Sequence, residues 1–143
     1  MIGWKETGTL AVTDRADGPR TDRVAVDPWS IVHMHSGSLM RDLDFWTASA
    51  VHAVWELTEQ TSLVVGRWRA QGYASYDGDT VANTLADQFF FSLGWWLSLP
   101  EEVMLVTTAA TMLRWPKMAT VQAFALLPAL AARARGPRPW TFH

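Results

Sequence analysis

The sequence predicts an all-α fold, a membrane-embedded bundle of about four to five helices over residues 27–135, flanked by polar terminal arms. Several apolar segments of helical length are bounded by capping residues, glycine or proline. The alternation typical of strands is almost absent. Hydrophobic residues make up 49% of the chain, charged residues only 18%, and there are nine tryptophans, which favour sites with one apolar and one wet side.

The two arms are recognised by their polar composition. Residues 1–26 are rich in Gly, Thr, Asp and Arg and are expected to be extended, with a short strand in "GTLAV" (8–12). No apolar core follows the first methionine, so this stretch is not expected to be a signal peptide. Residues 136–143, "GPRPWTFH", are expected to form an irregular tail.

The first two predicted helices have recognisable ends. "PWSIVHMHSGSLM" (28–40) carries Pro28 near its first turn, where proline is favoured. Residues 44–66 follow, with Asp44 as N-cap and Gly66 as stop signal. The Gly and polar content of residues 67–78 predicts a loop.

The strongest helical pattern runs over residues 79–99, with Asp79 or Thr80 as N-cap and Pro100 ending it. Residues 101–115 begin with two acidic residues, which suits a helix N-terminus. A last helix is predicted over 117–135, kinked at Pro128.

Hydropathy alone does not separate a membrane bundle from a soluble one. The longest charge-free runs, 88–100 and 118–132, fall short of the ~18 residues that mark a membrane span. Inserting Asp87 into a bilayer costs roughly 2.5–3.5 kcal/mol, and the apolar residues of its helix contribute a favourable insertion free energy of about the same size. That helix therefore suits a bilayer only if Asp87 faces protein. Tryptophans near helix ends and the nearly apolar last two helices favour the membrane bundle. Lys and Arg residues would be equally divided between the two sides of the membrane, so they predict no orientation.

Two polar stripes interrupt the apolar helices. The first, at offsets i, i+4 and i+7, falls on one helical face, and the second, at i, i+4 and i+8, falls on the next long helix. Antiparallel packing of the two helices would bring the stripes together. The stripes are His52, Glu56 and Glu59, and Asp79, Asn83 and Asp87.

Buried carboxylates without compensation bind protons or recruit a cation. The first alternative is a polar cluster held by salt bridges, in which Arg67 and Arg69 are the nearest basic residues. The second is a divalent metal site, with His33 as the nitrogen ligand. Its ligands would be Glu56, Glu59, Asp87 and His33.

Purely structural roles would also explain several of these residues. Asp79 suits an N-cap better than a ligand, and His52 could be an ordinary core histidine. His33 and His35 diverge on a helix, so that pair suits a metal only if the segment is extended.

Some functional classes are excluded by what the sequence lacks. There is no cysteine, hence no disulfide, thiolate zinc site or cysteine nucleophile. The net charge of −2 does not indicate a nucleic-acid-binding protein. "DGD" (77–79) is not followed by the later ligands of an EF-hand, and no phosphate loop, nucleophile elbow or HExxH motif is present.

The middle of the chain resembles a family of small bacterial integral-membrane proteins of unknown function. The family pattern is W-E-x-x-E-x-[ST], Arg-aromatic-Arg, and Tyr-x-Gly-Asp-[ST]-x-x-Asn-[ST]-x-x-Asp. Here "WELTEQTSLVVGRWR" (55–69) and "YDGDTVANTLAD" (76–87) match it, within a resemblance over roughly residues 27–115. The chain departs in lacking the family's first hydrophobic helix and in having Ser36 in place of a second histidine.

This resemblance implies a helical bundle in a bacterial inner membrane, in contact with lipid, but implies no activity. The leading hypothesis is a non-catalytic component that packs against other membrane proteins. The alternatives are an intramembrane metal- or ion-binding protein or enzyme, and a soluble all-α binding module. In the former, the functional residues would be Glu56, Glu59, Asn83 and Asp87.

Overall fold

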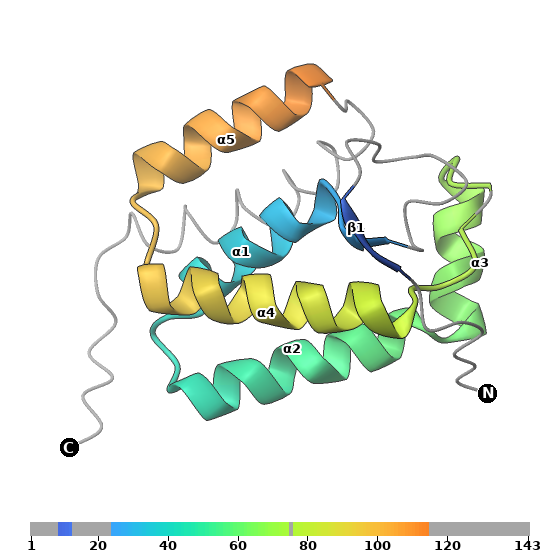
Figure 1. Cartoon of the computed structure of the whole chain (residues 1–143), viewed down its shortest axis with the longest axis horizontal. Helices are drawn as coiled ribbons and strands as arrows, with labels where there is room; N and C mark the ends of the chain where they lie inside the picture. Colours follow the sequence, from blue (N-terminus) through green and yellow to red (C-terminus); the bar gives the residue numbers. More distant parts are fainter. Residues whose placement is uncertain (1–8, 13–23, 75, 115–143) are drawn as a thin grey trace. The chain divides into compact units, whose positions relative to one another are not determined.

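The computed structural model describes residues 9–12, 24–74 and 76–114. Within them the chain forms two short strands and five helices (Figure 1), which confirms the predicted helical class. The elements are β1 Thr9–Val12, β2 Val24–Val26, α1 Trp29–Leu39, α2 Phe45–Glu59, α3 Ser62–Ala70, α4 Val81–Leu97 and α5 Glu101–Arg114. The predicted helix over 117–135 and the predicted tail lie outside the described residues.

The strand expected in "GTLAV" is β1, and it pairs in parallel with β2. The predicted N-terminal arm therefore contains both strands. Contacts within the chain group it into two units, residues 1–99 and 100–143. α5 belongs to the second unit, and its buried residues Met104, Thr108 and Thr111 recur at helical spacing.

Side-chain caps start three of the helices. Asp44 accepts a hydrogen bond from Thr47 N at 3.0 Å and starts α2, as predicted. Thr80 accepts one from Asn83 N at 3.4 Å and starts α4, so the cap is Thr80 and not Asp79.

The prediction of one helix over 44–66 is wrong in its second half. The chain breaks after Glu59, and Thr61 accepts a hydrogen bond from Val64 N to start a separate helix, α3. Gly66 lies inside α3 and does not stop it, so the predicted loop begins only after Ala70.

α1 and α4 touch backbone to backbone. A Cβ added to Gly37 would overlap the carbonyl group of Phe91, and one added to Gly94 would overlap that of Met34. Ser38 Oγ donates to Gly94 O at 2.8 Å. Residues without bulk at the crossing therefore set the distance between these two helices.

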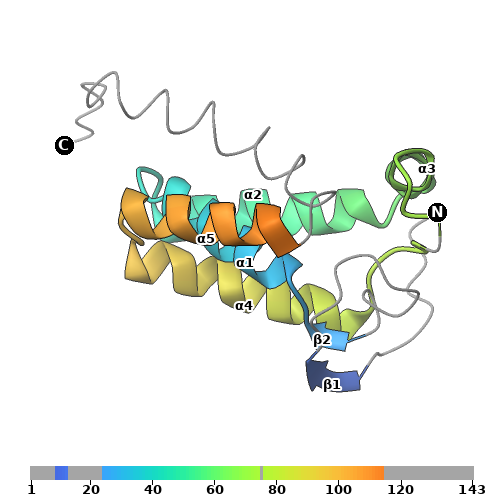
Figure 2. The same ribbon diagram turned by 90° about the horizontal axis from the view of Figure 1, so that it is seen from above.

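Among the described residues of the first unit, most buried side chains are polar, and many large apolar side chains are exposed. α4 packs against both α1 and α2 (Figures 1 and 2). α2 buries His52 and Glu56 but exposes Val54 and Trp55, and α4 buries Asp87 but exposes other large apolar side chains. This is the reverse of an amphipathic helix on a water-soluble protein.

Among the described residues, no helix combines the length and the apolar character needed to cross a bilayer. α4, for example, has 17 residues and contains Asp87.

Candidate functional site

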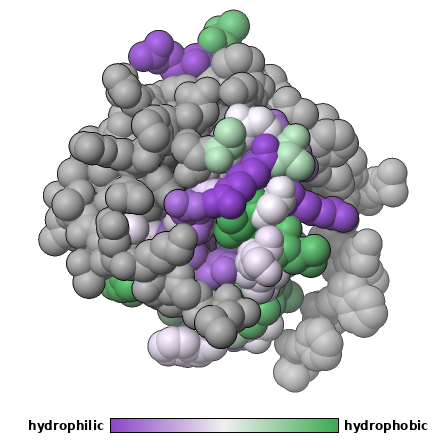
Figure 3. Space-filling model, turned by 90° about the vertical axis from the view of Figure 1, so that its right-hand side faces the viewer, coloured by the Kyte–Doolittle hydropathy of each residue, from purple (hydrophilic) through white to green (hydrophobic). Residues whose placement is uncertain are grey.

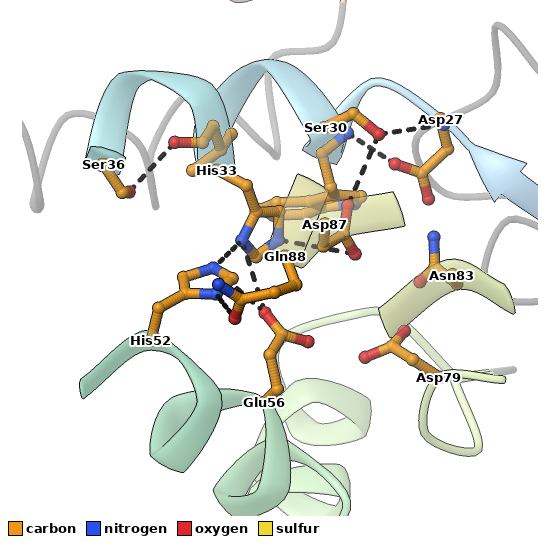
Figure 4. A network of polar contacts seen from close by, with 12 residues as sticks. Asp27, Ser30, His33, Ser36, His52, Glu56, Asp79, Asn83, Asp87 and Gln88 are labelled. Atoms are coloured by element: carbon orange, nitrogen blue, oxygen red, sulfur yellow. Dashed lines mark hydrogen bonds and ion pairs between the residues drawn. The ribbon is translucent and has the colours of Figure 1, made fainter. Parts of the chain in front are cut away.

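The centre of the polar interior is a triangle of three side chains from two helices. His33 comes from α1, and His52 and Glu56 come from successive turns of α2. His33 Nδ1 lies 2.8 Å from His52 Nε2 and 3.4 Å from Glu56 Oε1, and His52 Nε2 lies 3.2 Å from the same oxygen. Figure 4 shows the three side chains converging.

Glu56 is the least satisfied member of the triangle. The residue is 2% exposed, and neither of its carboxyl oxygens has a hydrogen-bond partner. A buried polar group without a partner costs about 1–3 kcal/mol, and more if it is charged. The position of Glu56 therefore requires a bound proton, a cation or another functional explanation.

Gln88 of α4 orients His52. Gln88 Nε2 donates to Ser49 Oγ at 2.8 Å, so its oxygen Oε1 faces His52 Nδ1 at 2.9 Å. His52 Nδ1 must then carry the hydrogen, which leaves the lone pair of Nε2 directed into the triangle.

Asp87 occupies the other side of His33. Its Oδ2 lies 3.6 Å from His33 Nε2, and its Oδ1 accepts a hydrogen bond from Ser30 Oγ at 3.4 Å. Ser30 in turn lies beside Asp27, whose backbone N–H donates to the serine hydroxyl. The cluster thus continues from the triangle to the start of α1.

A second group of carboxylates shares Glu56. Suitable ligand atoms of Glu56, Glu59 and Asp79 lie within 4.8 Å of one another, as do those of the histidine triangle. Asp79 Oδ2 accepts hydrogen bonds from Tyr76 Oη at 2.9 Å and Gln60 Nε2 at 3.4 Å. Figure 4 shows Asn83, which is also buried, on the same side as Asp79.

Burial dominates the electrostatics of the cluster. It raises the pKa of Glu56 from 4.5 to about 8, with a further increase from Asp79, and it raises the pKa of Asp87 well above its usual value. Burial and the proximity of His52 lower the pKa of His33 to about 3. At pH 7 without a bound cation, the imidazole of His33 is therefore neutral and Glu56 is mostly protonated.

The two arginines expected near the cluster lie elsewhere. Both Arg67 and Arg69 are exposed. Arg69 forms an ion pair with Asp77 and donates to Tyr76 O at 2.7 Å. Figure 3 shows hydrophilic side chains gathered on this α3 side of the molecule. The loop that follows α3 therefore supplies the hydrogen-bond acceptors of Arg69, and the buried carboxylates do not.

The structure thus brings together most of the residues that the two stripes contain, and it adds two roles. The ligand atoms of His33 and Glu56 belong to the triangle, Asp87 lies behind His33, and Glu59 lies in the second carboxylate group. His52, which the sequence places on the first stripe with an ordinary core histidine as the alternative, is a corner of the triangle. The role of Gln88 could be found only from the packing of α4 against α2.

The chain matches the family described as "Protein of unknown function (DUF2585)" over residues 28–123, more than half of its 143 residues. It belongs to this family. The matched region includes every residue of the histidine triangle and of the second carboxylate group. No curated protein and no solved structure matches the chain.

Proposed function

We propose that this chain is a helical component of a membrane, with its polar cluster turned inward and its apolar surface against lipid and other membrane proteins. The observation that carries the proposal is the reversed distribution of side chains. Among the described residues, four hydrophobic residues are buried, against fourteen polar or charged ones.

Many large apolar side chains of the described residues are exposed. Trp46 is 79% exposed, Leu85 64% and Phe89 61%. Covering a large apolar side chain contributes roughly 1.5–3 kcal/mol relative to leaving it in water. A surface with several such side chains is typical of contact with a membrane or a partner protein.

Aromatic side chains gather at both ends of α4. Phe45, Trp46, Trp95 and Trp96 form one cluster of ring contacts, where α2 begins and α4 ends. A second cluster lies around the loop that precedes α4, and its members are Trp29, Trp68, Tyr73 and Tyr76. Tryptophan and tyrosine favour positions with one apolar and one wet side, so aromatic clusters at the two ends of α4 suit contact with membrane–water interfaces.

The contact between α1 and α4 also suits a membrane. Helices in lipid gain little from apolar burial, so they associate through small residues and hydrogen bonds between them. Gly37, Ser38 and Gly94 provide both at this crossing. Asp87 of α4 is 2% exposed and faces His33, so its carboxyl group points into the bundle and would not contact lipid.

Fractionation of bacterial cells that express the chain tests the proposal. We expect it in the inner-membrane fraction, resistant to an alkaline carbonate wash and extracted by mild detergent. Purified in that detergent, it is expected in a particle that contains further membrane proteins. Phe89→Lys is expected to weaken membrane retention, whereas Asp42→Lys, in an exposed loop, is the matched control. A wild-type chain found as a water-soluble monomer would refute the proposal.

A further inference from the structure

The histidine triangle has the geometry of a metal site. We propose that His33 Nδ1, His52 Nε2 and Glu56 Oε1 bind one divalent first-row transition metal ion. The three atoms lie 2.8, 3.2 and 3.4 Å apart. Two ligand atoms at about 2.1 Å from one ion are about 3 Å apart at a right angle and about 3.4 Å apart at a tetrahedral angle. The triangle therefore closes around a single ion without movement of the helices.

The unpartnered carboxyl group of Glu56 is an independent sign of a ligand. Its two oxygens are buried and make no hydrogen bond, although two imidazole nitrogens lie within 3.4 Å of Oε1. A cation at the centre of the triangle would satisfy this oxygen and both nitrogen lone pairs at once.

On each histidine, the ring nitrogen that does not face the triangle lies near a polar side chain, as is usual for metal-bound histidines. His52 Nδ1 donates to Gln88 Oε1 at 2.9 Å, and that amide is fixed by its own bond to Ser49. His33 turns Nε2 towards Asp87 Oδ2 at 3.6 Å. Such partners fix the tautomer and raise the basicity of the ligand nitrogen.

The ligand set selects a class of metal. Two imidazoles and one carboxylate suit Zn²⁺, Fe²⁺, Mn²⁺ or Co²⁺, whereas Ca²⁺ and Mg²⁺ prefer oxygen ligands throughout. Three protein ligands leave coordination positions open for water or a small ligand. The second carboxylate group offers a competing site, but Asp79 is already engaged by Tyr76 and Gln60.

Without a metal, a hydrogen bond between the two imidazoles is the alternative state of the triangle, with His33 Nδ1 donating to His52 Nε2. The two states differ in metal content, in the absorption of a Co²⁺-loaded protein and in thermal stability with added metal. These readouts hold whether the chain is purified in detergent or in water, so the metal site can fail while the membrane proposal stands.

The test is elemental analysis of the full chain, purified in mild detergent and reloaded with Zn²⁺ or Co²⁺. We expect about one ion per chain in the wild type. Glu56→Gln keeps the size of the side chain, and His52→Ala removes a nitrogen ligand, and both are expected to lose the ion. Glu59→Gln is the matched control and is expected to retain it, while Gln88→Leu is expected to weaken binding by about 10–100-fold.

Helical circular dichroism of each variant separates loss of the site from loss of the fold. A wild type that takes up no ion would overturn the proposal. So would a folded Glu56→Gln variant that binds as tightly as the wild type, or loss of the ion in Glu59→Gln alone, which would move the site to the second carboxylate group.

Discussion

Replacing Gly94 by alanine tests whether α1 and α4 touch as closely as the structure shows. The added Cβ would lie 2.7 Å from the carbonyl carbon of Met34 and 2.9 Å from its Cα. Carbon atoms in contact are normally about 3.5–4.0 Å apart, and the carbonyl oxygen of Met34 lies closer to the added Cβ than either carbon, so the helices must separate by at least about 1 Å. Because the obstacle is backbone, a change of side-chain rotamer cannot relieve it.

The magnitude follows from three contributions. Overpacking costs about 1–3 kcal/mol. Loss of the 2.8 Å bond from Ser38 to Gly94 O adds about 0.5–1.5 kcal/mol. Alanine in a helix interior returns up to about 1 kcal/mol relative to glycine. Together these contributions predict that Gly94→Ala lowers the free energy of unfolding by about 0.5–4.5 kcal/mol.

Gly66→Ala is the matched control, because a Cβ there meets no atom within 4 Å. It is expected to leave the stability unchanged or raise it by up to about 1 kcal/mol. Denaturant-induced unfolding in detergent micelles, followed by circular dichroism, measures both variants. If Gly94→Ala were stabilised as much as Gly66→Ala, the close approach of the two helices would be refuted.

Three further predictions concern hydrogen bonds and burial. Ser38→Ala removes two hydrogen bonds at the helix crossing, the one that Ser38 Oγ donates to Gly94 O and the one that it accepts from Leu99 N, while Gly94 O keeps its bond from Ser98 N. At about 0.5–1.5 kcal/mol for each bond, the variant is expected to lose about 1–3 kcal/mol of unfolding free energy. Ser36→Ala loses a bond within its own helix and should change the stability by less than about 0.5 kcal/mol. Thr80→Ala removes the cap of α4 and is expected to cost about 1 kcal/mol, which Thr80→Ser should largely restore. Burial raises the pKa of Asp27 from 3.8 to about 7, so the unfolded state releases its proton first, and Asp27 lowers the wild-type stability as the pH rises from about 4 to 7, by up to about 1.4 kcal/mol per pH unit. Glu56 and Asp87, whose pKa values burial also raises, add to this decrease. Asp27→Asn should therefore make the decrease shallower by the share of Asp27, as measured by unfolding at a series of pH values.

Each of these predictions can fail separately. Equal losses in the two serine variants would show that Ser38 does not bridge the helices. A Thr80→Ser variant as unstable as Thr80→Ala would remove the capping role. An Asp27→Asn variant with the same pH dependence as the wild type would place the titration on other buried carboxyl groups.

Helix starts could be predicted from the sequence because capping chemistry is local. Asp44 and Thr80 bond to backbone groups three residues ahead, a distance that the sequence alone determines. The break after Glu59 does not follow from the sequence alone: residues 58–62 are polar, but Glu59 and Gln60 are good helix formers and apolar residues resume at Leu63. Gly66 does not mark a helix end, because a single glycine is tolerated inside a helix.

The site could be predicted in part for the same reason. Helical spacing places His52 and Glu56 on one face, and Asp87 on a face of another helix. Which partners these side chains find depends on how three helices pack. The meeting of His33 with His52, separated by 19 residues, is a tertiary contact that no local pattern contains.

The reversed interior and exterior are tested most directly by cysteine accessibility, since the natural chain has no cysteine. Phe89→Cys lies on the exposed apolar side of α4, and Asp42→Cys lies in an exposed loop. Maleimide reacts with the hydrated thiolate, so a thiol covered by lipid or by a partner helix is protected. In sonicated native membranes we predict labelling of the loop cysteine and none at position 89 until the protein is denatured. Equal labelling of both positions in intact membranes would contradict the account.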